Sequence, residues 1–597
     1  MFLRCKIRKK DGKEHRSWSI VENQRLASGQ VVQHHVLYLG EINDTQSLAW
    51  RKSIEAFLEN QPDAPPATLS LFPEDTEATA VADEDIVRLR LKEIKLCRPR
   101  QWGACWLALH TWKELGLDAF WQERLPRSRK GTSWDQILAV LTCYRLIAPG
   151  SEWQLHRQWF LQSAMADLLG GDFGLAEQHK LYECHDRLLE HKEALFTHLQ
   201  GRWKDLFNAS FEVLLYDLTS TYFESSPPFP PGDKRRYGYS RDKRSDCVQV
   251  VIALIVTPEG FPLAYEVFPG NTSDKTTLKD FLARIEKQYG KAKRIWVMDR
   301  GIPTDEVLKE MREQEPPVNY LVGTPKGRLD KYEQALLEKT WQQAREGVEV
   351  KLLPQDKELY VLARSHDRVS KERSMRRRQL KWLWRRLKEI QGMTVKRDEL
   401  LKKLGVAQHE ASAAWRLIKV TVAPAKQKEK GSFTYQLDKD KLRTVRRREG
   451  SYLLRSNLSE TDPAKLWHFY LQLTQVEEAF RNLKGDLAIR PIHHQVEKRI
   501  EAHIFISFLA YCLHVTLGRR LRDLAPGLTT RSVLEKFAAV QMLDVRIPTT
   551  DKREIVLTRY TEPERDLQLL IEKLKLDLPP QPPPKIAAQP QQSTPGL

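Results

Sequence analysis

Residues 211–323 constrain the fold more than any other part of the chain, because short apolar runs bounded by turn residues follow one another there in a fixed order. Three runs come first, which predicts three consecutive strands in a meander. Helical and strand-like segments then alternate. The expected strands are 213–216, 248–256, 261–268, 294–298 and 318–322, and helices are expected to begin near 273 and 303. The predicted order is βββαβαβ.

That order is found in ribonuclease-H-like cores, an α/β fold in which a mixed sheet carries acids near its centre. At 597 residues, the chain has room for several further modules. Composition and turn residues predict the following parts: a small N-terminal β-rich module (1–60), a linker (61–85), a tryptophan-rich helical module for which DNA binding remains open (86–205), the first part of the core (206–329), a basic insertion domain (330–455), the second part of the core with an acid-bearing helix (456–525), a C-terminal helical segment (526–578) and a disordered Pro/Gln-rich tail (579–597).

Asp217 and Asp299 stand at strand positions where a carboxylate is unusual. Asp217 lies inside an apolar segment, where an ionised acid needs a cation or a donor. Asp299 ends the run 294–298 and precedes Arg300 and Gly301, and acids at strand ends of open sheets often face a ligand cleft. The alternatives are an ion pair for Asp217 and a cap or turn for Asp299. Because both belong to one predicted sheet, we expect them to share a site.

Glu477 lies on a predicted helix that begins at Asp462 and Pro463 and ends near Lys484. Tyr470 and Lys484 each lie seven residues from Glu477, close to two helical turns, so the three side chains are expected on one face. Such a stripe can bind metal at the carboxylate and phosphates at its ends. An ordinary solvated face is the alternative.

Asp217, Asp299 and Glu477 therefore form a candidate catalytic and metal-binding trio. Crowded carboxylates raise one another's pKa values unless a cation neutralises them. Oxygen-only ligation favours two Mg²⁺ or Mn²⁺ ions, which suit in-line displacement at phosphorus by water or a DNA 3′-hydroxyl. The trio indicates nucleic-acid strand chemistry.

The charge of the chain favours a polyanionic partner, since 97 Lys and Arg against 79 Asp and Glu give a formal net charge of +18. Nine Lys or Arg and one acid lie between Lys371 and Lys388. DNA-backbone contact is the expected use of this run, and a solvated charged helix is the alternative. The candidate phosphate-binding residues of the run are Arg376, Arg377, Arg378, Arg385 and Arg386.

Cysteines, histidines and apolar stretches restrict the remaining possibilities. The seven cysteines are scattered without a C-x-x-C pair, which predicts reduced thiols in a cytoplasmic protein. His493, His494 and His503 lack zinc-ligand spacing, so core or surface roles are expected. The longest apolar stretch, 504–518, is short for a membrane span, and no membrane partner is expected.

Three segments together resemble the DDE transposases of bacterial insertion sequences: Tyr216 to Phe223, Val297 to Gly301, and Tyr470 to Lys484. The third is similar to the signature of the YREK-bearing group, in the insertion-sequence-four superfamily, which spaces its residues as Y-x2-R-x3-E-x6-K. Tyr470, Glu477 and Lys484 match this spacing, but Leu473 stands at the Arg position. The resemblance covers about 210–325 and 455–520.

The resemblance implies a transposase that cuts DNA with Mg²⁺ at the terminal inverted repeats of its own element and joins the freed 3′-hydroxyl to target DNA. The trio would hold the metals, Tyr470 and Lys484 would position phosphates, and a hairpin would form on the flipped-out end. Arg481 or another basic group would replace the missing arginine at Leu473. The resemblance also implies a homodimer on paired ends of double-stranded DNA, in the bacterial cytoplasm and associated with the nucleoid. The alternatives are a nuclease without strand transfer and a catalytically silent DNA-binding regulator.

Overall fold

The computed structural model describes most of the chain, and the expected linker 61–85, the start of the helix expected near 273 and the tail beyond 588 lie outside the described residues. The described residues are 2–10, 13–25, 31–43, 46–48, 50–52, 54, 89–128, 131–240, 242, 244–272, 278, 281, 283, 285–286, 294–299, 303–324, 339–355, 357–423, 432–459, 462–551 and 553–588.

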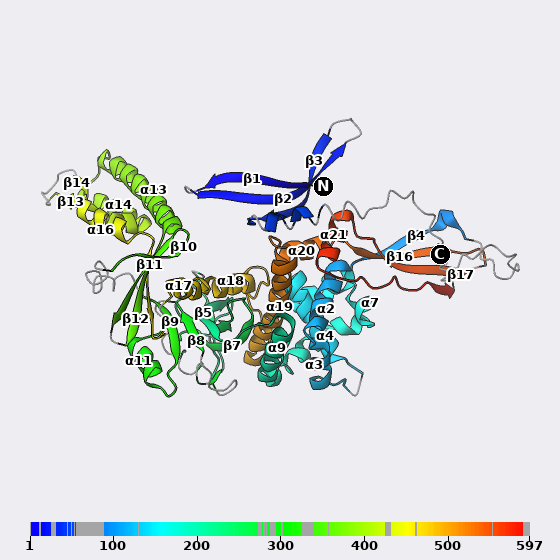
Figure 1. Cartoon of the computed structure of the whole chain (residues 1–597). Coiled ribbons are helices and arrows are strands. Elements are labelled where there is room, and N and C mark those ends of the chain that lie inside the picture. The colour runs from blue at the N-terminus through cyan, green and yellow to red at the C-terminus, as the bar shows by residue number, and fades with distance from the viewer. Residues whose placement is uncertain are drawn as a thin grey trace.

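A nine-stranded mixed sheet forms the centre of the molecule, in the order β10-β11-β12-β15-β9-β8-β5-β6-β7 (Figure 1). Its core strands are β5 (Val213–Phe223), β6 (Val248–Val256), β7 (Pro262–Pro269), β8 (Ile295–Met298) and β9 (Asn319–Thr324). The first three form an antiparallel meander, whereas β8 pairs in parallel with both β5 and β9. All nine residues of β6 are buried, as expected for a central apolar strand. The predicted strand order and the ribonuclease-H-like mixed α/β fold are confirmed.

The sheet continues across the expected boundary at residue 330. The added strands are β10 (Gln342–Arg345), β11 (Val348–Gln355), β12 (Glu358–Ser365) and β15 (Ser451–Ser456). Strand β15 pairs with β9 on one side and β12 on the other. Buried Glu358 of β12 accepts two hydrogen bonds from Arg455 Nε of β15, at 2.8 and 2.7 Å, and a third from the Tyr320 hydroxyl of β9. Part of the expected insertion is therefore a continuation of the core sheet.

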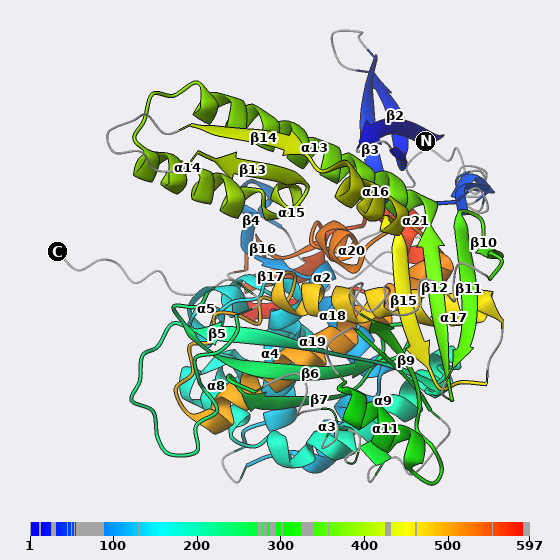
Figure 2. The ribbon, with the colours of Figure 1, turned by 90° about the vertical axis from the view of Figure 1, so that its left-hand side faces the viewer.

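The remainder of the insertion is an arm that projects away from the sheet (Figures 1 and 2). The arm contains α13 (His366–Gln391), α14 (Arg397–Glu410), α15 (Ser412–Trp415), β13 (Ile418–Val422), β14 (Phe433–Leu437) and α16 (Lys439–Arg448). Leu383, Leu387 and Ile390 of α13 are buried in a small core that is separate from the main one, together with Leu400 and Phe433. The apolar residues of the basic run thus lie on one face of α13 and pack into this small core. The polar face of α13 is left for other contacts.

Helices on one side of the sheet surround α19 (Glu497–Leu524), which packs against α2 (Gly103–Glu114), α4 (Trp134–Ile147) and α8 (Gln178–His185). By length and hydropathy α19 could cross a membrane, but 89% of its most apolar window is buried inside the protein. Most of the tryptophans between 102 and 159 are buried, which confirms that they belong to the core. Helix α9 (Lys192–Phe207) then connects this layer to β5.

A four-stranded sheet of order β18-β17-β16-β4 corrects three expectations for the terminal regions. Strand β4 (Lys95–Gln101) interrupts the helical module, and β16 (Gln541–Pro548) and β17 (Arg553–Tyr560) lie in the segment expected to be helical. Residues 579–588 were expected to be disordered, but β18 (Lys585–Ala588) pairs with β17. Short alternating strands with distant partners are difficult to recognise locally. The side chain of Gln581 also fixes this end, since it bonds both the amide and the carbonyl of Tyr560.

The N-terminal strands β1 (Phe2–Lys10), β2 (Lys13–Arg25) and β3 (Val31–Gly40) form the predicted small antiparallel sheet. In Figure 1 this sheet lies above the main body, between the arm and the C-terminal helices. The indole of Trp50 donates a hydrogen bond to the carbonyl of Pro526 at 2.8 Å, and both groups are buried. This contact attaches the N-terminal module to the body.

Candidate active site

Asp217 and Asp299 are neighbours in the central sheet. Strands β5 and β8 run in parallel, with Tyr216 paired to Met298. Asp217 directly follows Tyr216, and Asp299 directly follows Met298, so the two aspartates lie next to each other at the ends of this pairing. Asp217 is half-buried and accepts a hydrogen bond from the amide of Leu218 at 2.8 Å, and Asp299 is exposed directly after β8. The parallel pairing of β5 and β8 therefore brings the two predicted acids together.

Glu477 approaches the same place from α18 (Leu473–Lys484), which packs across β5 and β6 (Figure 2). The buried face of α18 has the spacing of an amphipathic helix, with Leu473, Val476, Ala479, Phe480 and Leu483 against the sheet. Glu477 follows Val476 at the margin of this face and is exposed. Asp217, Asp299, Glu477 and Tyr470 all line one pocket of about 160 Å³. The structure thus assembles the predicted trio together with Tyr470.

The predicted single helix from 463 to 484 is wrong, because it is broken at Gln472. Helix α17 (Pro463–Leu471) begins as expected, with Asp462 accepting a hydrogen bond from the amide of Ala464. At the break, the Thr474 hydroxyl bonds the carbonyl of Leu471, and the amide of Gln475 bonds the carbonyl of Gln472. Such side-chain bonding competes with the helical ladder. Tyr470 reaches the pocket from a separate helix rather than along one continuous face.

Lys484 does not line the pocket. Its ammonium donates to Asp242 Oδ1 at 2.9 Å, and Arg490 pairs with the other oxygen of the same carboxylate. Burial raises the pKa of Asp242, but the hydrogen bonds from Arg490 and Lys484 outweigh it, so the pKa lies below its ordinary value. Arg481 is also outside the pocket, 74% exposed and 3.5 Å from Glu478. Of the predicted phosphate-binding residues on these helices, only Tyr470 lies beside the acids.

Arg368, Tyr452 and Trp467 line the pocket and were missed in the sequence. Arg368 lies in the first turn of α13, with its guanidinium carbon 4.4 Å from the centre of the Tyr452 ring and its Nε 2.9 Å from Glu372. Tyr452 in turn contacts the rings of Trp467 and Tyr470, with centroids 5.4 and 5.6 Å apart. Leu473, at the position where the YREK signature has arginine, contributes a buried apolar surface instead. The guanidinium beside the trio therefore comes from Arg368, which has no local sequence signal.

The arm carries the predicted basic surface, with one correction. Arg377, Arg378 and Arg385 are exposed, and Arg386 is half-buried and pairs with Glu389 at 3.2 Å. Arg376 is instead buried and paired with Glu449, so the prediction that it is available for phosphate is wrong. The turn that leads into β15 brings Glu449 against α13, which accounts for this burial. Burial lowers the pKa of Arg376, and nearby Arg446, Arg373 and Arg377 lower it further, which shows how closely the cations are grouped.

The chemistry of the pocket fits a hard divalent cation. Its three acids offer only carboxylate oxygens, which Mg²⁺ and Mn²⁺ prefer. No histidine or cysteine is present among the described residues that line it.

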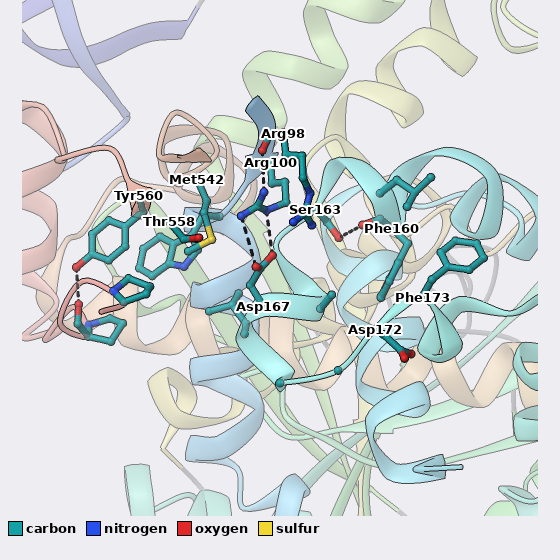
Figure 3. A pocket seen from close by; sticks show the side chains of 18 of the residues that line it. Arg98, Arg100, Phe160, Ser163, Asp167, Asp172, Phe173, Met542, Thr558 and Tyr560 are labelled. Carbon is teal, nitrogen blue, oxygen red and sulfur yellow. Dashed lines mark hydrogen bonds and ion pairs between the residues drawn. The ribbon is translucent and has the colours of Figure 1, made fainter. Parts of the chain in front are cut away.

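A larger pocket of about 770 Å³ lies elsewhere, between β4, the helices around residue 165 and the C-terminal strands (Figure 3). The guanidinium of Arg100 points at Asp167, with Nε 2.9 Å from its carboxylate, and also pairs with Asp544 at 2.9 Å. These ion pairs join β4 to its neighbours. The smaller pocket, in which three carboxylates from β5, the end of β8 and α18 converge, is the better candidate for catalysis.

A ribonuclease-H-like sheet with two strand aspartates and a helix glutamate in one pocket defines a protein of the DDE class. Residues 209–513, more than half of the chain, match the family described as the transposase DDE domain. The chain belongs to this family. No curated protein matches it significantly.

Among solved structures, the chain is similar to the piggyBac transposase in a cryo-EM structure of its synaptic complex with hairpin DNA. The two share 10% sequence identity, the similarity covers 76% of this chain and 81% of that one, and the TM-score is 0.33.

Proposed function

We propose that this protein is a DNA transposase that cleaves DNA at the ends of its own mobile element and transfers the freed 3′-hydroxyl to target DNA. The observation that carries the proposal is the convergence of Asp217, Asp299 and Glu477 in one pocket of a transposase-family core. The spacing of Tyr470, Glu477 and Lys484 supports the YREK-bearing group of bacterial insertion sequences. Function in the bacterial cytoplasm, as a homodimer on paired inverted repeats, belongs to the same proposal.

Asp217, Asp299 and Glu477 are the residues that would hold two Mg²⁺ or Mn²⁺ ions. Bound there, the ions would stabilise the attacking and leaving oxygens of an in-line phosphoryl displacement. Arg368 supplies a guanidinium for the phosphate beside the trio, as the missing YREK arginine would. The rings of Tyr452, Trp467 and Tyr470 contact one another and form one wall of the pocket.

The arm is the proposed contact for the DNA backbone outside the pocket. Its exposed arginines on α13 and those of α16 at 446–448 lie close together, and Arg368 links the start of α13 to the pocket. A duplex held along α13 would therefore lead toward the acids. Because these contacts are to phosphates, affinity should fall steeply with salt.

The proposal can be tested with duplexes taken from the DNA that flanks this reading frame on both sides, incubated with purified protein and Mg²⁺. We expect cleavage at inverted repeats, followed by joined products, and no products with Asp299→Asn. Glu535→Gln is the matched control, since Glu535 is an exposed acid of α20 (Thr530–Phe537) that pairs with Arg531 at 2.9 Å.

Three results would contradict the proposal. Nicked products without joined species would indicate a nuclease, and binding without cleavage would indicate a silent regulator. Unchanged cleavage by Asp299→Asn would show that the active site lies elsewhere.

A further inference from the structure

Four buried side chains meet among the helices that pack around α19, and none of them lines the three-acid pocket. Glu152 lies on α5 (Glu152–Gln154), His185 ends α8, His494 lies in the segment after α18, and His503 lies on α19. Their exposed fractions are 6%, 0%, 7% and 5%. These residues are called the Glu152 cluster below. They come from four parts of the chain, which is why the spacing of the histidines gave no zinc signal.

The distances within the cluster suit a metal centre. Glu152 Oε1 lies 3.3 Å from His494 Nε2, 3.4 Å from His185 Nε2 and 3.8 Å from His503 Nδ1. The ligand atoms of Glu152, His494 and His503 all lie within 4.8 Å of one another. In a tetrahedral zinc site with bonds of about 2.0–2.1 Å, neighbouring ligand atoms are about 3.4 Å apart. Glu152, His494 and His503 are thus close enough to bind one ion, and His185 Nε2 approaches the same carboxylate oxygen.

Two histidines of the cluster each use one ring nitrogen to bond a backbone carbonyl outside the cluster. When such a ring is neutral, its other nitrogen points a lone pair into the cluster. His185 Nδ1 bonds the carbonyl of Leu181 at 2.8 Å, and His503 Nε2 bonds the carbonyl of Ile489 at 3.3 Å. A carbonyl only accepts, so these nitrogens carry the protons and the opposite nitrogens face the Glu152 carboxylate as acceptors. Backbone carbonyls orient metal-bound histidines in this way. The lone pair of each facing nitrogen therefore needs a metal ion, a proton or a hydrogen-bond donor as its partner.

His185 Nε2 is the clearest sign that a partner is missing. Although it lies 3.4 Å from Glu152 Oε1, the atom has no hydrogen-bond partner within the described structure. It belongs to a fully buried side chain, where an unsatisfied polar atom costs about 1–3 kcal/mol. A bound ion would satisfy it.

Arg145 is a cation beside the cluster. Its Nη2 lies 3.5 Å from His503 Nδ1, a long contact, while Nη1 donates to the carbonyl of Ala488 at 3.3 Å. If a metal takes the histidine nitrogen, the guanidinium keeps its backbone acceptor. The rival occupant of the cluster is a proton, which would turn one imidazole into a cation paired with Glu152.

We propose that Glu152, His185, His494 and His503 form a closed structural Zn²⁺ site. Three imidazoles and one carboxylate are ligands that zinc favours, and four protein ligands leave no open position for chemistry. The ion would join α5, α8 and α19 to the segment that follows the acid-bearing helix α18. Its role is independent of the proposed function and of the all-oxygen pocket.

The test is the metal content of the full-length protein, grown with added zinc and purified without chelator. We expect about one tightly held zinc per chain, as for a closed four-ligand site. We also expect that Co²⁺ added to the metal-free protein produces the visible absorption of tetrahedral cobalt. Both measurements use the unaltered chain, so they do not depend on the folding of a variant.

Variants then locate the ion. His494→Gln and Glu152→Gln should lose the zinc and the cobalt spectrum. His156→Gln is the matched control, because His156 is a half-buried histidine nearby in sequence that bonds Ala176 instead. Asp299→Asn should also keep the zinc, since it alters only the other pocket.

Two results would overturn the proposal. Folded wild-type protein that contains no zinc and gives no tetrahedral cobalt spectrum would show that a proton occupies the cluster. Zinc that is lost in Asp299→Asn but kept in His494→Gln would place the ion in the three-acid pocket.

Discussion

The three-acid pocket and the Glu152 cluster each gather side chains from distant parts of the chain, but they differ in exposure and in donor atoms. Asp299 and Glu477 are exposed, and the metal ligands proposed for the pocket are carboxylates, whereas the Glu152 cluster is buried and rich in imidazole. Open oxygen sites suit ions that must contact a substrate, and closed nitrogen-rich sites suit ions that hold a fold together. The comparison predicts that changes in the pocket affect activity, and changes in the cluster affect stability.

The largest expected effect is the loss of activity in Glu477→Gln. Removing one carboxylate of the trio should lower the cleavage rate on the order of 10³-fold or more, since groups that act as a unit fail together. The melting temperature should not fall, because one source of charge repulsion is removed. Single-turnover cleavage and thermal unfolding measure the two. A variant that unfolds early would instead give the pocket a structural role.

Glu152→Ala should have the opposite effect. It removes the carboxylate whose negative charge acts on Arg145, a side chain that is 4% exposed, and leaving a buried charge uncompensated costs about 3–5 kcal/mol. Denaturant unfolding should show this loss, while the protein that remains folded should still cleave DNA. Full stability with abolished cleavage would remove the distinction between the two sites.

Arg368→Ala tests which cation serves the pocket. Because its guanidinium lines the pocket, the cleavage rate should fall by about 10²-fold, as when a transition-state donor is removed. Arg481→Ala is the matched control. Arg481 is 74% exposed and pairs with Glu478, so its loss should cost at most about 1 kcal/mol of stability and change cleavage little. The reverse ranking of the two variants would restore Arg481 as the replacement for the missing arginine.

The smallest expected effect is on the stability of the protein at acid pH. Lys484 and Arg490 hold the pKa of Asp242 below its ordinary value of 3.8. A carboxyl with a depressed folded pKa contributes stability that is present above the ordinary pKa and is lost as pH falls through the folded value. Wild type should therefore lose more stability than Asp242→Asn below about pH 4, by up to about 1 kcal/mol. Equal acid sensitivity of the two proteins would contradict this assignment.

The meander and the acids were predictable because their signals are local. Strand β6 is apolar along its length, and Asp217 stands out against the apolar residues around it. Glu477 could be placed because the buried face of α18 repeats with helical spacing. In each case the pattern and the chemistry lie within one element.

The features that were missed depend on partners far along the chain. Strands β10, β11 and β12 joined the sheet through pairing partners that their own residues do not indicate, and Arg368 reaches the pocket from α13, which begins directly after β12. The Glu152 cluster joins residues about 350 positions apart, and Lys484 pairs with Asp242, which is also distant in the sequence. Local residue spacing contains no information about such long-range contacts. The break at Gln472 involves only nearby residues, including the hydrogen bond from the Thr474 hydroxyl to the carbonyl of Leu471. The spacing of apolar residues alone does not reveal it.

The arm leaves the sheet at the end of β12 and returns at the start of β15, and Arg364 of one strand pairs directly with Ser451 of the other. Without the arm, these two strands would be an ordinary hairpin closed by a short turn. The part of the arm beyond Arg368 can therefore vary in length and content without changing the register of the sheet. If the proposed function holds, such variation would change the DNA contacts of the protein while the sheet that positions the acids stays the same.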